Sequence, residues 1–123
     1  MDRETIIRDW LINLESGCKD NVTHWAFMEM AFLDPAPDPE EAWACILEGV
    51  RRASSEKILG IIGASALENF LAHHGDAFID RVEREAGVDA RFRMVVAHVW
   101  RWRISEPVWQ RIEKLQAEGG FES

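Results

Sequence analysis

This 123-residue sequence has few cysteines and no long apolar run. These two shortages argue against a disulfide-rich or zinc-binding protein and against a membrane-spanning one. The two cysteines, Cys18 and Cys45, lie in separate segments without a CxxC or Cys/His spacing, so we expect reduced thiols and neither a disulfide framework nor a structural zinc site. The densest apolar run, residues 25–33, contains a glutamate and is far shorter than the ~20 residues that cross a membrane. The first residues lack the basic stretch and the following apolar stretch of a signal peptide. We therefore predict a cytoplasmic protein without a signal peptide.

Common enzyme motifs are missing as well. The sequence contains no GxGxxG or GxxxxGK[ST] for phosphate groups, no GxSxG nucleophile motif and no HExxH zinc motif. A catalytic site would have to be assembled from scattered residues. We therefore predict no cofactor and no metal, and we favour a protein that is not an enzyme.

Helical periodicity is what the sequence does contain, from one end to the other. In residues 3–16, for example, Ile6, Ile7, Trp10, Leu11 and Leu14 fall on one stripe of a helix. No segment alternates as a strand does, so we predict an all-α fold in a single domain, residues 1–123. The expected architecture is an irregular bundle of seven or eight short antiparallel helices, or a short stack of helical hairpins. These helices are expected near residues 3–16, 22–33, 39–50, 58–62, 65–74, 76–86, 89–102 and 105–115.

The boundaries of these helices follow from local chemistry. Gly17 and Gly75 are expected to end helices in a left-handed conformation, and Pro39 suits a first helical turn. In the sequence SALE, Ser65 and Glu68 form a capping box, which predicts a new helix start. The residues expected to cap helix N-termini are Asp38, Ser65, Asp76 and Asp89.

The segment 22–33 is apolar nearly all round its expected helix. A helix of this kind lies in the centre of a core or is covered by a partner. A homodimer formed through this helix is therefore one open alternative.

The negative charge of the protein is concentrated in the first part of the sequence. Residues 1–50 contain 3 basic and 11 acidic side chains, whereas residues 51–123 contain 11 of each, so the first part supplies the whole net charge of −8. Such a surface attracts basic proteins and repels phosphate backbones, which makes direct nucleic-acid binding unfavourable. Five carboxylates around a proline-rich joint are the candidate binding residues: Asp34, Asp38, Glu40, Glu41 and Glu48. Helix capping and the helix dipole are alternative explanations for Asp38, Glu40 and Glu41.

The paired histidines in LENFLAHHGDAFIDRVE admit two interpretations. His74 follows Phe70 by one turn and lies in the last turn before Gly75, where an imidazolium interacts favourably with exposed carbonyls. Helix termination explains that position, and we favour it. The alternative is a hydrolase-type pocket, for which the candidate residues are Glu68, His73, His74 and Arg93.

Arginine and tryptophan alternate in the segment DARFRMVVAHVWRWR, residues 89–103. One interpretation is that the tryptophan rings stack on bases and the arginines contact phosphates. We favour the other, in which the arginines form ion pairs with the acidic residues at 80, 83, 85 and 89. Met94, His98 and Trp102 align along the expected helix. They form either a second buried face or a small patch for a partner, and Trp102 is therefore a candidate binding residue.

Residues 39–112 resemble a family of small bacterial helical proteins of unknown function. The similarity is carried by SALENFLAHHG, by FIDRVEREAGVDARFRMVVAHVW and by VWQRI. The family typically has Gly-Pro before Leu-Glu, where this chain has Ala-Ser-Ala. The resemblance implies an all-helical fold and a bacterial origin, and no activity. The residues that match are Leu67, Glu68, His74, Gly75, Phe78, Ile79, Glu83, Asp89, Phe92, Arg93, Val99, Trp100 and Trp109.

Three functional hypotheses follow from the sequence. The leading one is a small acidic binding module that neutralises or regulates a basic protein, as an immunity protein or an anti-defence inhibitor does. The others are the hydrolase with a Glu/His site and the dimeric scaffold.

Overall fold

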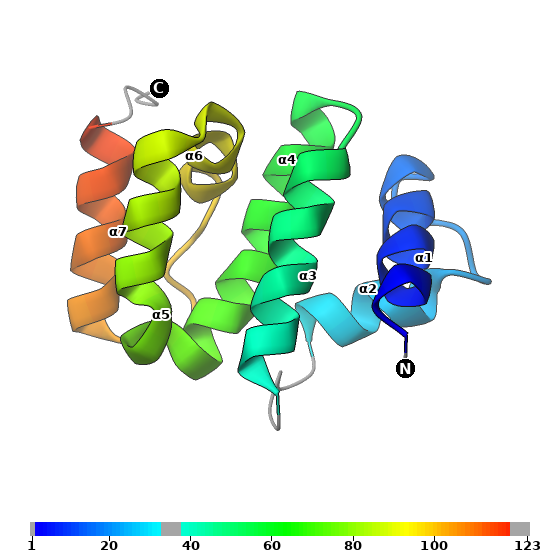
Figure 1. Ribbon diagram of the computed structural model, residues 1–123, viewed down its shortest axis with the longest axis horizontal. Helices are drawn as coiled ribbons and strands as arrows, with labels where there is room; N and C mark the ends of the chain where they lie inside the picture. Colours follow the sequence, from blue (N-terminus) through cyan, green and yellow to red (C-terminus); the bar gives the residue numbers. More distant parts are fainter. Residues whose placement is uncertain (1, 33–37, 119–123) are drawn as a thin grey trace.

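The computed structural model describes residues 2–32 and 38–118, and within them every regular element is helical (Figure 1). The predicted all-α class is confirmed. Asp34 lies outside the described residues. The elements are α1 (Arg3–Glu15), α2 (His24–Ala31), α3 (Pro39–Arg52), α4 (Glu56–Ile62), the π-helix η1 (Gly63–Leu67), α5 (Glu68–Val88), α6 (Ala90–Ala97) and α7 (Glu106–Glu118).

The elements α4, η1 and α5 follow one another without a break. The described residues therefore contain six continuous helical segments, fewer than the seven or eight that we expected. The capping box does not form, because the Ser65 hydroxyl donates to the carbonyl of Ile61 inside the helix. Gly75 does not end a helix either, and Asp76 is consequently not an N-cap. The expected boundary is a kink instead, with His74 at φ −133° and ψ 19°.

The other predicted helix ends are closer to the structure. Gly17 adopts φ +74° just after α1, as a left-handed C-terminal glycine does. The Asp38 carboxylate accepts from the backbone N–H of Glu41 at 3.1 Å, and that of Asp89 accepts from Arg91 N–H at 2.9 Å. Both aspartates cap the helices that they were predicted to cap.

Helices α1 and α2 lie at one end of the molecule and α5, α6 and α7 at the other, with α3 and α4 between them (Figure 1). The core joins these parts through large aromatic side chains. The ring of Trp43 on α3 lies 5.8 Å from that of Phe70, 5.9 Å from that of Phe78 and 5.8 Å from that of Phe92, centroid to centroid. Trp10 on α1 is fully buried and packs directly on Gly49 of α3.

Helix α2 is half in the core. Ala26, Met30 and Ala31 are buried, whereas Met28 and Phe32 are 40% and 55% exposed. The helix packs mainly on α1. Its outer side is thus the surface that a homodimer, the open alternative, would use. None of the described helices is both long enough and apolar enough to span a membrane.

Candidate partner-binding surface

Glu40 and Glu41, two carboxylates beside the proline-rich joint, form ion pairs within the molecule. Glu41 accepts two hydrogen bonds from the guanidinium of Arg3, at 2.7 and 2.6 Å. Glu40 accepts from Arg81 of α5 at 2.6 Å. These hydrogen bonds, with the positive charge of each arginine, hold the pKa of both carboxyls below its usual range.

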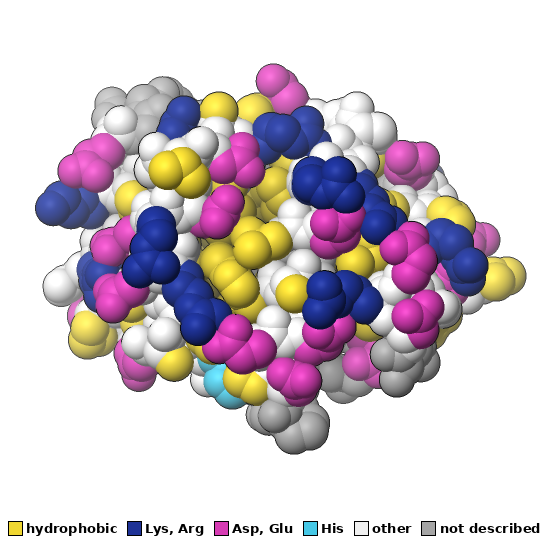
Figure 2. Space-filling model, in the orientation of Figure 1, with side chains coloured by type: hydrophobic (Ala, Val, Ile, Leu, Met, Phe, Trp, Pro, Cys, Tyr) yellow, Lys and Arg dark blue, Asp and Glu magenta, His cyan; other side chains and the backbone are white. Residues whose placement is uncertain are grey.

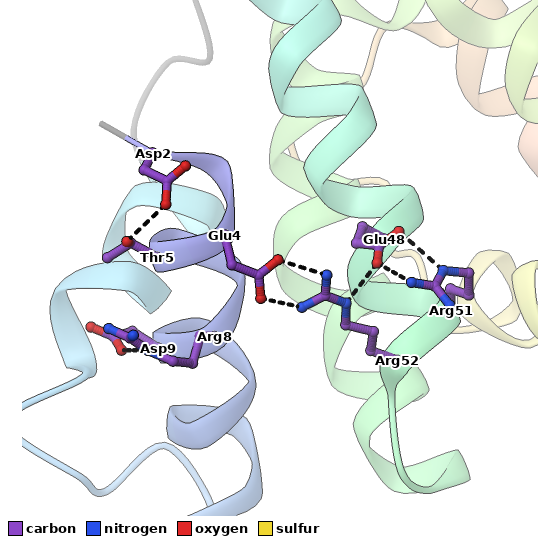
Figure 3. Close-up of polar contacts among 8 residues, drawn as sticks. All are labelled: Asp2, Glu4, Thr5, Arg8, Asp9, Glu48, Arg51 and Arg52. Atoms are coloured by element: carbon purple, nitrogen blue, oxygen red, sulfur yellow. Dashed lines mark hydrogen bonds and ion pairs between the residues drawn. The ribbon is translucent and has the colours of Figure 1, made fainter.

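Glu48 belongs to a network of charges that joins α1 to α3 (Figure 3). It accepts from Arg51 and, at 2.6 Å, from Nε of Arg52. The same Arg52 donates to both carboxylate oxygens of Glu4, at 2.7 and 2.8 Å. Hydrogen bonds from Arg51 and Arg52 lower the pKa of Glu48 to about 2. The carboxylate is therefore ionised and occupied by its own neighbours.

Charges that are separated along the sequence are mixed in space. Arg51, Arg52 and Arg81 follow residue 50, yet each pairs with a carboxylate that precedes it. On the face in Figure 2, acidic and basic side chains lie next to one another around a hollow with apolar side chains. Glu40, Glu41 and Glu48 thus form ion pairs. The exposed carboxylate of Asp38 caps α3 and has no ion pair among the described residues.

The tryptophan loop, residues 98–105, exposes two large aromatic side chains between α6 and α7. Trp100 is 74% exposed and Trp102 is 53% exposed. We predicted a helix as far as Trp102, but α6 ends at Ala97. The buried side chains of Val99 and Ile104 hold the two sides of the loop against the core, which turns the chain away from the helix axis.

Polar contacts fix the backbone of this loop. The Glu68 carboxylate accepts from the N–H of Trp100 at 2.9 Å, and the side-chain amide of Gln116 donates to the carbonyl of Val99 at 3.0 Å. Within the loop, Ile104 N–H donates to the carbonyl of Arg101 at 2.7 Å. Partial burial raises the pKa of Glu68, while the Trp100 N–H acts in the opposite direction. The two exposed indoles are therefore presented on an ordered loop.

The two histidines lie at the kink of α5, beside a small hollow. This kink hollow has a volume of about 210 Å³, and its polar lining comes from α5 and from the tryptophan loop. The lining side chains that carry polar groups are His73, His74, Asp76, Arg103 and Ser105. His73 donates from Nδ1 to the carbonyl of Asn69 at 3.0 Å, because a carbonyl can only accept.

The predicted hydrolase pocket is assembled only in part. His73 and His74 share the kink hollow, but Glu68 holds the tryptophan loop and Arg93 lines a different hollow of about 160 Å³ with Ala86 and Leu115. Arg93 also donates to the carbonyl of Ala86 at 2.8 Å. Its expected ion pair with an acidic residue is absent among the described residues.

Three polar residues of the kink hollow were not among the predicted site residues: Asp76, Arg103 and Ser105. The sequence signal for Arg103 was its place in the RWR alternation. The sequence pattern at Asp76 and at Ser105 predicted only the start of a helix. Their proximity depends on how α7 packs beside α5, which local patterns do not encode.

No grouping of three or more His, Cys, Asp or Glu side chains suited to a metal occurs in residues 2–32 and 38–118. Burial raises the pKa of the Cys45 thiol to about 11 and also raises that of Cys18, which favours the protonated thiol over the reactive thiolate.

The fold and this surface define a class, that of small all-helical proteins with an ordered tryptophan loop beside a polar hollow. The chain belongs to a family of unknown function, DUF6869, whose family model matches residues 13–120. No curated protein matches the chain. No solved structure matches it either.

Proposed function

We propose that the protein is a binding module and not an enzyme, and that it attaches to a basic protein through the tryptophan loop. The observation that carries this proposal is the exposure of Trp100 and Trp102 on a backbone held by Glu68 and Gln116. Tryptophan is the residue type most enriched at binding hot spots, and an ordered loop loses little conformational entropy when it binds.

The chemistry of the indole ring supports a basic partner. Arginine and lysine side chains bind to the face of a tryptophan ring by cation–π attraction. The loop already contains one such contact, because the guanidinium of Arg103 lies 4.9 Å from the ring centroid of Trp102. The ring of Trp100, which is the more exposed, offers a face for a cation of the partner.

The net charge supports the same partner over a longer range. Internal ion pairs cancel local fields but leave the net charge of −8 unchanged. A basic protein is therefore attracted as it approaches, and the indoles supply the contact. The role that fits is neutralisation or regulation of that basic protein in a bacterial cytoplasm, as in an immunity protein or an anti-defence inhibitor.

The two alternative functions have weaker support. For a hydrolase, Ser105 would have to be activated by an imidazole, but its hydroxyl lies 3.5 Å from the Asp76 carboxylate. For a dimeric scaffold, the support is the outer side of α2, with Met28 and Phe32 exposed. Neither surface combines large aromatic side chains with an ordered loop.

Affinity capture with matched variants tests the proposal. We expect the native chain, from a lysate of the organism that carries it, to retain a basic protein. The variants Trp100→Ala and Trp102→Asn should weaken this binding about 30-fold, because one hot-spot side chain is worth about 2 kcal/mol. Asparagine suits position 102, where φ is +39°.

The control is Val22→Ala, which truncates an apolar side chain that is 80% exposed in the segment between α1 and α2. Retention of the same protein by this variant and its loss from both tryptophan variants would support the proposal. Equal binding by all variants, or capture of acidic proteins only, would contradict it.

A further inference from the structure

We infer that the kink hollow binds a small oxyanion, a carboxylate or a phosphate group, through Arg103 and His73. This site stands apart from the proposed function, since it concerns a small ligand and needs no protein partner. The hollow has a volume of about 210 Å³, and the residues that line it carry a guanidinium, two imidazoles, a hydroxyl and one carboxylate.

Arg103 differs from most arginines of the molecule. Arg3, Arg52 and Arg111, among others, pair with carboxylates, and Arg91 and Arg93 donate to backbone carbonyls. Among the described residues, Arg103 has no carboxylate or carbonyl partner, and it is held by the ring of Trp102 instead. Because Arg103 also lines the hollow, its planar donors are available to an oxyanion there.

The backbone at Trp102 supports a functional role for this arrangement. Trp102 has φ +39°, a conformation that a large side chain rarely adopts and that carries a cost. The strained residue is the one that supports Arg103. Strain of this kind persists where surrounding contacts hold it, and it is common at binding sites.

His73 offers the ligand only one of its ring nitrogens. Because Nδ1 donates to the carbonyl of Asn69, only Nε2 can contact a ligand in the hollow. In the neutral ring Nε2 is an acceptor, whereas in the imidazolium it is a donor. Binding of an anion by His73 therefore requires protonation of the ring and should strengthen as pH falls.

The other charged groups at the hollow modulate this dependence. His74 and Asp76 come from α5, and Arg103 comes from the tryptophan loop. The Asp76 carboxylate opposes an incoming anion, although the Ser105 hydroxyl lies 3.5 Å from it and offsets part of its charge. Removal of the Asp76 charge should strengthen binding, while removal of the Arg103 charge should weaken it.

The experiment is a titration of the full chain with sodium acetate and with sodium phosphate, followed by NMR signals of the His73 ring and the Trp102 indole. Sodium chloride at equal ionic strength is the control for screening. We expect a saturable shift, tightening several-fold from about pH 8 to about pH 6 for acetate, which stays anionic at both values. A preference for acetate would indicate a carboxylate from a peptide, and a preference for phosphate would indicate a phosphorylated ligand.

Three variants of exposed residues make the test specific. Arg103→Gln should weaken binding at least about tenfold, because a charge-assisted bidentate contact is lost. His73→Gln should remove the pH dependence, and Asp76→Asn should tighten binding. The inference would be overturned if neither anion gave a saturable shift, or if Arg103→Gln bound the anion as tightly as the native chain. Either result is independent of whether the tryptophan variants lose their protein partner.

Discussion

At the scale of single residues, Glu68 connects the end of the π-helix to the tryptophan loop. Its carboxylate accepts from the N–H of Trp100, so one side chain on a rigid helix positions a loop that follows it by about thirty residues. Partial burial makes ionisation of this carboxyl less favourable and raises its pKa. The hydrogen bond and the charge can therefore be separated by mutation.

We expect Glu68→Gln and Glu68→Ala to behave differently. The glutamine carbonyl can still accept from Trp100 without a buried charge, so this variant should keep the loop ordered, whereas alanine leaves the N–H without its partner. Hydrogen exchange at the Trp100 amide should be faster in the alanine variant and nearly unchanged in the glutamine variant. Equal exchange in both would show that Glu68 does not hold the loop.

The pH dependence of stability gives the second part of this prediction. The folded state raises the pKa of Glu68 above the usual 4.5, so it favours the protonated carboxyl. Stability that depends on this group is therefore present at low pH and falls as pH rises from about 4.5 through the folded pKa. Urea unfolding over this range should show the decrease in the native chain and not in Glu68→Gln.

Predictions that rested on local chemistry held at some helix ends and failed at others. Asp38 and Asp89 cap helices as expected, because a capping hydrogen bond spans only two or three residues. Ser65 and Glu68 have the same signature, yet the helix continues through them and Glu68 turns to a distant N–H. The choice was decided by tertiary contacts of η1, which no short motif records.

At the scale of elements, η1 and α6 approach each other closely. A Cβ on Gly63 would lie 2.0 Å from the carbonyl oxygen of Val95, so the helices meet where only a glycine fits. One turn earlier, the imidazole of His98 lies over Gly60, where an added Cβ would be 3.1 Å from the ring. Glycine at position 63 is thus explained by packing between helices and not by the helix end that we had predicted there.

A matched pair of glycine substitutions tests this explanation. Gly63→Ala should destabilise the fold by about 3 kcal/mol, because backbone atoms must shift to admit the methyl group. Gly87→Ala, on the same continuous helix but with open space around it, should stabilise by about 0.5 kcal/mol. Thermal unfolding of both variants measures the difference. A neutral Gly63→Ala would refute the close approach of η1 and α6.

Helix periodicity predicted the elements better than it predicted their ends. The stripe Phe92, Val95, Val96 and Val99 is buried as expected, but the helix that carries it stops at Ala97. Trp100 and Trp102 were therefore placed on a helix although they lie on a loop. A period of 3.6 identifies the buried face, and it contains no information on where a chain must turn to reach the next helix.

At the scale of the whole molecule, the net charge follows from composition alone, whereas the pairing of charges depends on the fold. Arg81 lies far from Glu40 in the chain and next to it in the fold, and Arg52 joins Glu4 to Glu48. Pairing of this kind leaves the net charge of −8 unchanged. The field of this net charge acts on the rate of encounter, while contact residues act on the lifetime of a complex.

Kinetics should therefore separate the two contributions to binding of the captured basic protein. Glu29 and Glu113 are exposed and have no ion pair among the described residues, and their joint replacement by lysine changes the net charge from −8 to about −4. We expect this variant to associate several-fold more slowly at low salt, with a shallower salt dependence and an unchanged dissociation rate.

The association and dissociation rates of each variant can be measured with the captured protein immobilised on a sensor surface. In this measurement Trp100→Ala should dissociate faster than the native chain and associate at a nearly unchanged rate. The two effects are expected to be additive in the combined variant, because a long-range field and a local contact act at different stages of binding. If the lysine variant associated as fast as the native chain at every salt concentration, electrostatic attraction of a basic partner would be refuted. The tryptophan loop would then have to select its partner by contact alone.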